Sequence, residues 1–193
     1  MPRRDNAPRW EKRTYKLEQN HKWKAKPGCQ IFVADRGAVR FDFPHGWVSV
    51  PNMDSGSIKL CDREPPDDDC TLEVSVQYLA LIDWSELPLS YLLTELDGGD
   101  GGMDQRGPVL AKDEIVEEKR GDLEIAWRSM RWIDPTQNRE ARSYTCLARR
   151  DFTQALITFD HWKDDEERLA KVWPIVIETL DVGRQPPGWG RNR

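Results

Sequence analysis

Histidine and cysteine side chains are the residues of this sequence best suited to nucleophilic or metal chemistry. The chain has three histidines and four cysteines, which are His21, His45, His161, Cys29, Cys61, Cys70 and Cys146. No two histidines have the HxH or HExxH spacing that places both on one metal, and the cysteines form no CxxC pair. A GxSxG nucleophile elbow is also missing. The sequence therefore predicts no catalytic residue, no metal site and no cofactor. A triad assembled from distant residues stays open, because triads are defined by geometry.

The segment 97–105, DGGDGGMDQ, places carboxylates on a glycine-rich backbone, which is an arrangement that can wrap a calcium ion. It lacks the D-x-D-x-D-G order of an EF-hand, and Met103 takes the acidic position of a GGxGxD repeat. Long glycine-rich segments are usually flexible linkers. We therefore interpret this segment as a solvated loop.

The first 27 residues combine aromatic and basic side chains. They hold nine Lys or Arg residues and three Asp or Glu residues, a net charge of +6, whereas the rest of the chain carries −11. Trp10, Tyr15 and Trp23 interleave with the basic residues, a mixture that could stack bases and contact phosphates. The same arm could instead dock on its own acidic domain, and we favour that interpretation because the domain repels nucleic acid.

The segment Leu123 to Ile133 reads as a strand with two covered faces. Trp127 shares the apolar side of Leu123, whereas Arg128 and Trp132 point to the opposite side. Tryptophan is enriched at binding surfaces, and the chain has nine tryptophans. We expect either the arm or a partner to lie on the second face. The candidate partner-binding residues are Trp10, Tyr15, Trp23, Arg128 and Trp132.

The length of the chain and the position of its structure-breaking residues predict one domain with two tails. The 193 residues suit a single core, and the breakers Lys26-Pro27-Gly28 mark its start. We predict an arm over 1–27, an α+β domain over 28–183 and a flexible tail over 184–193. The start of the sequence has no signal-peptide core, and no run of about 18 apolar residues predicts a membrane span. We expect a cytoplasmic protein with reduced cysteines, a Cys61 to Cys70 link being the alternative.

The order of elements predicts an α/β sandwich. Short strands over 29–34, 38–43, 47–50 and 57–61 precede a clear alternating strand over 70–81. A short helix over 84–96 follows, and then four strands from 114 to 162 form an antiparallel meander. A long amphipathic helix, capped by Asp164 and bent at Pro174, is expected to close the domain before Gly183. The class is α+β, an antiparallel sheet packed by two helices.

A short aromatic corner links this pattern to a known group of folds. The corner is Phe41-x-Phe43-Pro44-x-Gly46-Trp47, and the long strand, meander and terminal helix follow it. In this respect the chain resembles the PsbP/DcrB-like α/β proteins over residues 29–183. The resemblance implies proteins that bind other proteins and share no common active site.

The predicted function is therefore a non-catalytic protein-binding module, adaptor or chaperone-like protein with another protein as its partner. Two alternatives stay open at this point. The first is an enzyme with a dispersed active site near the glycine-rich loop. The second is a nucleic-acid binder that uses the basic arm, which the acidic domain disfavours.

Overall fold

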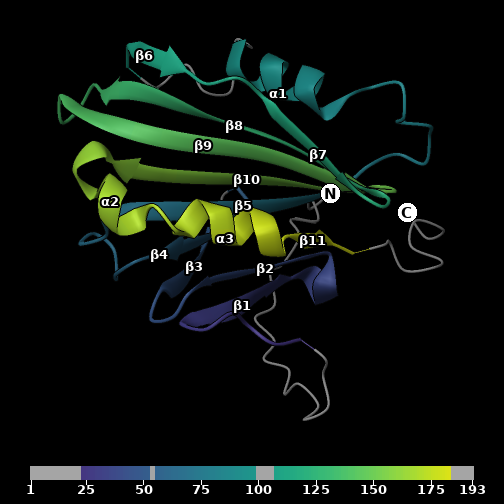
Figure 1. Ribbon diagram of the computed structural model, residues 1–193, viewed down its shortest axis with the longest axis horizontal. Helices are drawn as coiled ribbons and strands as arrows, with labels where there is room; N and C mark the ends of the chain where they lie inside the picture. Colours follow the sequence, from purple (N-terminus) through teal and green to yellow (C-terminus); the bar gives the residue numbers. More distant parts are fainter. Residues whose placement is uncertain (1–22, 53–54, 99–106, 184–193) are drawn as a thin grey trace, which may run out of the picture.

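Two antiparallel sheets and three α-helices make up the described part of the chain (Figure 1). The computed structural model describes residues 23–52, 55–98 and 107–183. The strands are β1 Cys29–Ala34, β2 Val39–Pro44, β3 Val48–Asn52, β4 Ser57–Cys61, β5 Cys70–Tyr78, β6 Val109–Lys112, β7 Val116–Arg120, β8 Leu123–Asp134, β9 Arg139–Arg150, β10 Thr153–Trp162 and β11 Asp181–Val182. The helices are α1 Leu89–Gly98, α2 Glu166–Leu169 and α3 Val172–Thr179.

The larger sheet has the strand order β3-β4-β5-β10-β9-β8-β6, and β7 pairs with β8 beside β6. The predicted meander is confirmed, because β7, β8, β9 and β10 pair in sequence order. Short connections force neighbouring strands to run antiparallel. The smaller sheet has the order β1-β2-β11, so the end of the domain returns to its beginning.

The main core lies between the larger sheet and the layer formed by the smaller sheet and α3. In Figure 1, α2, α3 and β11 (yellow-green to yellow) run along the long strands of the larger sheet. Phe41 is fully buried, and its ring lies 4.8 Å from that of Phe32. Trp173 of α3 stacks on Tyr144 of β9, with 5.0 Å between the ring centroids. Burying large aromatic rings is a principal source of stability in such a layer.

The aromatic side chains of the Phe41–Trp47 corner pack in this core, as the sequence predicts. Phe41 and Phe43 are buried, and the half-buried Trp47 lies 6.3 Å from Phe159 between ring centroids. Gly46 makes the turn with a φ of +89°, a left-handed conformation that glycine adopts without a steric cost.

A second, smaller core forms on the opposite face of the larger sheet. Leu89 and Leu93 of α1 pack against Ala126 of β8 and Leu147 of β9. Ile125, the neighbour of Ala126, belongs to the main core, since alternate residues of a strand point to opposite faces. Both faces of β8 are covered, as predicted, but around Ala126 the second face is covered by α1 and not by the arm or a partner, as we had expected.

The expected long C-terminal helix is wrong. The segment divides into a 3₁₀ turn, Lys163–Asp165, then α2 and then α3. Pro174 explains the division, because its ring clashes with the carbonyl four residues earlier, at Ala170. The break falls there, and Pro174 lies in the first turn of α3, where a missing amide costs little. Neither α2 nor the 3₁₀ turn has a side-chain cap in the described structure, so Asp164 is not the predicted cap.

Candidate functional site

A cavity of about 370 Å³ opens where β8, β9 and β10 approach the α2 end of the larger sheet. Trp132 of β8, Ala141 of β9 and Trp162 of β10 are register partners, so their side chains share one face. The described lining residues are Asp68, Asp69, Cys70, Thr71, Trp132, Ala141, Asp160, His161 and Trp162. We call this cavity the Trp132–Trp162 pocket.

Polar side chains hold the pocket wall in place. The indole Nε1 of Trp132 donates a hydrogen bond to Ser143 Oγ at 2.9 Å, and Ser143 Oγ donates in turn to Asp160 Oδ1. Ser143 is 1% exposed, so this chain of hydrogen bonds is shielded from solvent. On the other side, the hydroxyl of Thr71 donates to Asp68 at 3.2 Å. The regular strands and this network together fix the orientation of the Trp132 ring.

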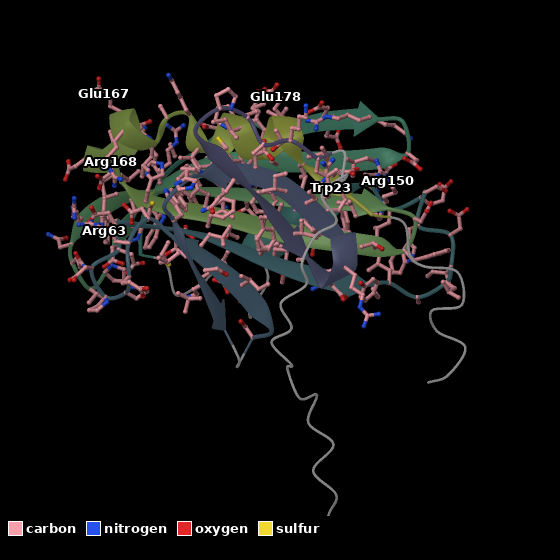
Figure 2. The ribbon with its side chains drawn as sticks, turned by 90° about the horizontal axis from the view of Figure 1, so that it is seen from below. Trp23, Arg63, Arg150, Glu167, Arg168 and Glu178 are labelled. Carbon is pink, nitrogen blue, oxygen red and sulfur yellow. The ribbon has the colours of Figure 1, made fainter. Side chains whose placement is uncertain are left out.

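Arginines on the loop and helix beside the pocket offset part of its acidic charge. Asp69 forms ion pairs with Arg63 and, at 3.6 Å, with Arg168. Figure 2 shows Arg63 and Arg168 at the same end of the molecule. Arg168 also reaches Asp62 at 2.9 Å, which contributes to a lowered pKa of that carboxyl, although burial opposes the effect. The Asp62 carboxyl therefore stays ionised at neutral pH.

The rim of the pocket already holds one stacked guanidinium. The Cζ atom of Arg139 lies 4.7 Å from the ring centroid of Trp162. The same guanidinium pairs with Asp164 at 2.9 Å. A cation on the face of an indole with a carboxylate beside it is a favourable arrangement.

Cys70 of β5 and His161 of β10 are cross-strand partners, and both line the bottom of the pocket. Burial raises the pKa of the Cys70 thiol and lowers the pKa of His161. His161 Nδ1 lies 2.9 Å from the carbonyl oxygen of Trp162, so Nδ1 carries the proton and donates it. A nucleophilic cysteine needs a thiolate, whereas this environment favours a neutral thiol beside a neutral imidazole.

The structure places the predicted residues Arg128 and Trp132 on one face of β8, as the alternation indicates. Trp132 lines the pocket. Arg128 lies two side-chain rows further along and pairs in register with Thr145. It is half-buried, and burial lowers the pKa of its guanidinium.

Trp23 lies away from the pocket, against the smaller sheet. Its ring is 5.1 Å from the Cζ atom of Arg40 on β2. Close by, the backbone N–H of Lys26 donates to Asp42 at 2.7 Å, and the Lys26 ammonium pairs with Glu178 of α3. Figure 2 shows Trp23 toward the end that carries Arg150, distant from Arg63 and Arg168. Trp10 and Tyr15 lie outside the described residues.

Sequence reasoning missed Asp160, Ser143 and Trp162 as neighbours of Trp132. The missing information was the pairing register of β8, β9 and β10. These residues lie on other strands than Trp132, and only the register shows which of them come next to it. The signal was present in the alternation of β9 and β10, once the short turns fix how the strands pair.

Within residues 23–52, 55–98 and 107–183, no set of three His, Cys, Asp or Glu side chains is arranged to hold a metal ion. Residues 99–106 of the glycine-rich segment lie outside the described chain. The four cysteines are free thiols, so Cys61 and Cys70 are not linked. In the part of the chain that the structure describes, no helix has the length and apolarity to cross a membrane.

The fold is that of the PsbP-like α+β proteins. A cyanobacterial PsbP from Synechocystis superposes with a TM-score of 0.51, and the match covers 82% of this chain and 95% of that structure at 13% identity. LpqN from Mycobacterium tuberculosis, described as involved in cell envelope biogenesis, gives 0.53 over 81% of this chain and 91% of its own at 13% identity. A Bacteroides thetaiotaomicron structure gives 0.54 over 82% and 50% at 14% identity. At these identities the similarity concerns the fold alone.

Sequence comparison identifies a narrower group within this fold class. The Alr1449 family matches residues 30–185. The uncharacterized protein alr1449 of Nostoc is 39% identical over 175 residues, which cover 90% of this chain and 88% of the relative. The chain belongs to the Alr1449 family.

Proposed function

We propose that the chain is a non-catalytic protein-binding module that receives a segment of a partner polypeptide in the Trp132–Trp162 pocket. One observation carries this proposal: two tryptophans on strands of one sheet flank a cavity whose wall is held by a buried polar network. Tryptophans held in this way commonly dominate the binding energy of an interface, because they desolvate a large area without losing much side-chain freedom.

The size and openness of the cavity favour a polypeptide segment over a large cofactor. A volume of about 370 Å³ lies at the low end of the range for ligand pockets, about 300 to 1,000 Å³. Such a volume suits one long side chain, and the loop 63–67 beside the pocket is exposed.

Capture from the native lysate with matched tryptophan variants tests this proposal. The bait is the full chain, and the variant is Trp162→Ser, which removes one wall of the pocket. The control is Trp84→Ser, since Trp84 is a half-buried tryptophan in the loop before α1. We expect the wild type and the control to enrich the same polypeptide and Trp162→Ser to lose it. Equal capture by Trp162→Ser, or no stoichiometric polypeptide in any sample, contradicts the proposal.

A cytoplasmic location is part of the same proposal. Cys61, Cys70 and Cys146 are buried free thiols, and Cys29 is a partly buried one, which suits a reducing compartment. Fractionation of the native cells tests the location, and recovery in an extracytoplasmic fraction would contradict it.

A further inference from the structure

We infer that β7 is the contact surface for a second copy of this chain. Two β7 strands pair antiparallel across a two-fold axis and join the larger sheets of two molecules. The inference goes beyond the proposed function and does not depend on it. It follows from the position of β7 at a sheet edge, from the apolar side chains exposed along that edge and from the order of charges in the strand.

β6 and β7 together form one edge of the larger sheet. Both pair with β8, on the side away from β9 (Figure 1). In the part of the chain that the structure describes, no strand pairs with their outer side. The buried leucines of α1 pack on the face formed by β8 and β9 rather than along this edge. A strand at a sheet edge presents backbone N–H and C=O groups that can pair with a further strand.

Apolar side chains are exposed along this edge. Val109 and Leu110 of β6 and Val116 of β7 are 48%, 50% and 43% exposed. Prolines and bulges commonly protect such edges from pairing. β6 has both devices, since Pro108 precedes it and its register shifts between Val109 and Ala111. β7 has an unbroken ladder with β8, so β7 is the part of the edge suited to pairing with another strand.

The charges of β7 complement each other when two copies pair antiparallel. The strand reads Val-Glu-Glu-Lys-Arg from 116 to 120. With the two-fold axis at Glu118, Glu117 of each copy faces Lys119 of the other copy, which gives two cross-strand pairs of opposite charge. The register of β7 on β8 places Glu117 and Lys119 on one face of the sheet, beside Ala126 and Glu124.

Glu117 and Lys119 can both reach a second molecule. Glu117 is exposed and forms no ion pair with another described residue. Lys119 is 69% exposed, and its contact with Glu124 is long, at 3.5 Å, whereas Arg149 pairs with Glu124 at 2.7 Å. An ammonium has three N–H donors, so Lys119 can bind Glu117 of the second copy as well.

The other charges near the axis are paired within each chain. Arg120 donates to Glu118 at 2.8 Å and to the carbonyl oxygen of Ile177 in α3 at 2.8 Å. The contact between copies therefore does not need Arg120. Glu118 faces its own copy at the axis with Arg120 beside it, which limits the repulsion between the two carboxylates. Such a contact is small and partly screened by salt, so we expect a concentration-dependent dimer.

Sedimentation equilibrium of the full chain over a range of protein concentrations tests the inference. We expect a monomer–dimer equilibrium whose dissociation constant rises with salt. Glu117→Lys and Lys119→Glu each place like charges opposite each other, and we expect each to raise the dissociation constant about tenfold. Lys171→Glu, which replaces an exposed lysine between α2 and α3, is the matched control and should dimerise as the wild type does.

Combining the two changes separates charge pairing from loss of stability. The double variant Glu117→Lys/Lys119→Glu exchanges the charges and restores both pairs, so we expect it to dimerise as the wild type does. A mixture of the two single variants should form a heterodimer in preference to either homodimer, because every facing pair is then opposite in charge. Urea unfolding of each variant checks that the monomer is folded.

Three outcomes overturn the inference. The first is a full chain that stays monomeric at the highest concentration at which it is soluble. The second is a dimer that the single variants form as well as the wild type does, because the contact then lies elsewhere. The third is a double variant that does not recover, because the antiparallel register is then wrong. None of them bears on the proposed function, since β7 pairs with the start of β8 and Trp132 lies near its end.

Discussion

The indole nitrogen of Trp132 lies 2.9 Å from the hydroxyl oxygen of Ser143 on the neighbouring strand, and that hydroxyl donates to Asp160 on the next strand. Ser143→Ala removes one acceptor and one donor at a site that is 1% exposed. A buried group left without its partner costs about 1 to 3 kcal/mol, so we expect a loss of about 2 kcal/mol in the free energy of unfolding. Urea unfolding measures it.

The matched control for this prediction is Ser49→Ala on β3. Ser49 is exposed, and we expect its replacement to change the free energy of unfolding by less than about 0.5 kcal/mol. A Ser143→Ala variant as stable as Ser49→Ala would show that the hydrogen-bonded chain contributes little.

His161 should make stability depend on pH just below neutrality. Burial lowers its pKa from the ordinary value of 6.5, so the unfolded chain takes up a proton that the folded chain resists. The contribution of the neutral ring is present above pH 6.5 and is lost as the pH falls toward the lower, folded-state pKa. We expect His161→Asn to flatten this part of the pH profile, measured by urea unfolding between pH 7.5 and 5.

Two comparisons separate this effect from other titrations. His45→Asn, which replaces an exposed histidine, is the comparison variant. Arg149 lowers the pKa of Glu124, and Lys163 and Arg142 lower that of Glu166, so these carboxylates lose their contribution below their ordinary value of 4.5. A profile for His161→Asn that matches the wild type between pH 5 and 6.5 would contradict the assignment.

Arg149 and Glu124 should be energetically coupled. Arg149 has a side chain that is 4% exposed, and it pairs with Glu124 at 2.7 Å. It also donates to the carbonyl of Leu87 at 3.0 Å, just before α1. Glu124→Gln leaves a buried guanidinium beside a neutral amide, and we expect a loss of about 2 kcal/mol in the free energy of unfolding.

A double-mutant cycle with Arg149→Met checks this coupling. We expect a coupling energy of about 1 to 2 kcal/mol, because the two side chains touch. Losses that simply add would show that the pair contributes little beyond its separate packing.

Leu93→Ala should loosen α1 before the rest of the fold. Leu93 is fully buried, in a cluster of four buried residues that is separate from the main core. Truncation of a buried leucine costs about 2 to 5 kcal/mol. We expect faster amide exchange in α1 than in β9 or β10, since the helix packs on this smaller cluster rather than on the main core. Val176→Ala, in the main core, is the comparison and should accelerate exchange in both regions.

The sequence by itself indicated most of the strands, with β6 and β11 as exceptions, and which side chains share a face of one strand. The alternation of β8 placed Ile125 and Trp127 opposite Ala126 and Trp132, and short turns fixed the order of the meander. In the corner from Phe41 to Trp47, the glycine indicated the turn and the aromatic residues indicated burial in the core. These features are local, because side-chain period and turn chemistry act over a few residues.

Pro174 indicated from the sequence that the C-terminal helix is disturbed, but only the structure showed that the helix divides there and how the pocket is assembled. A helical stripe of apolar residues reads the same whether the helix is continuous or divided, and the clash with the carbonyl of Ala170 depends on backbone geometry. The pocket joins Asp68, Trp132 and Asp160 from distant parts of the chain. Strand register and the return of the loop before β5 bring them together, and neither is encoded in the spacing of these residues along the sequence.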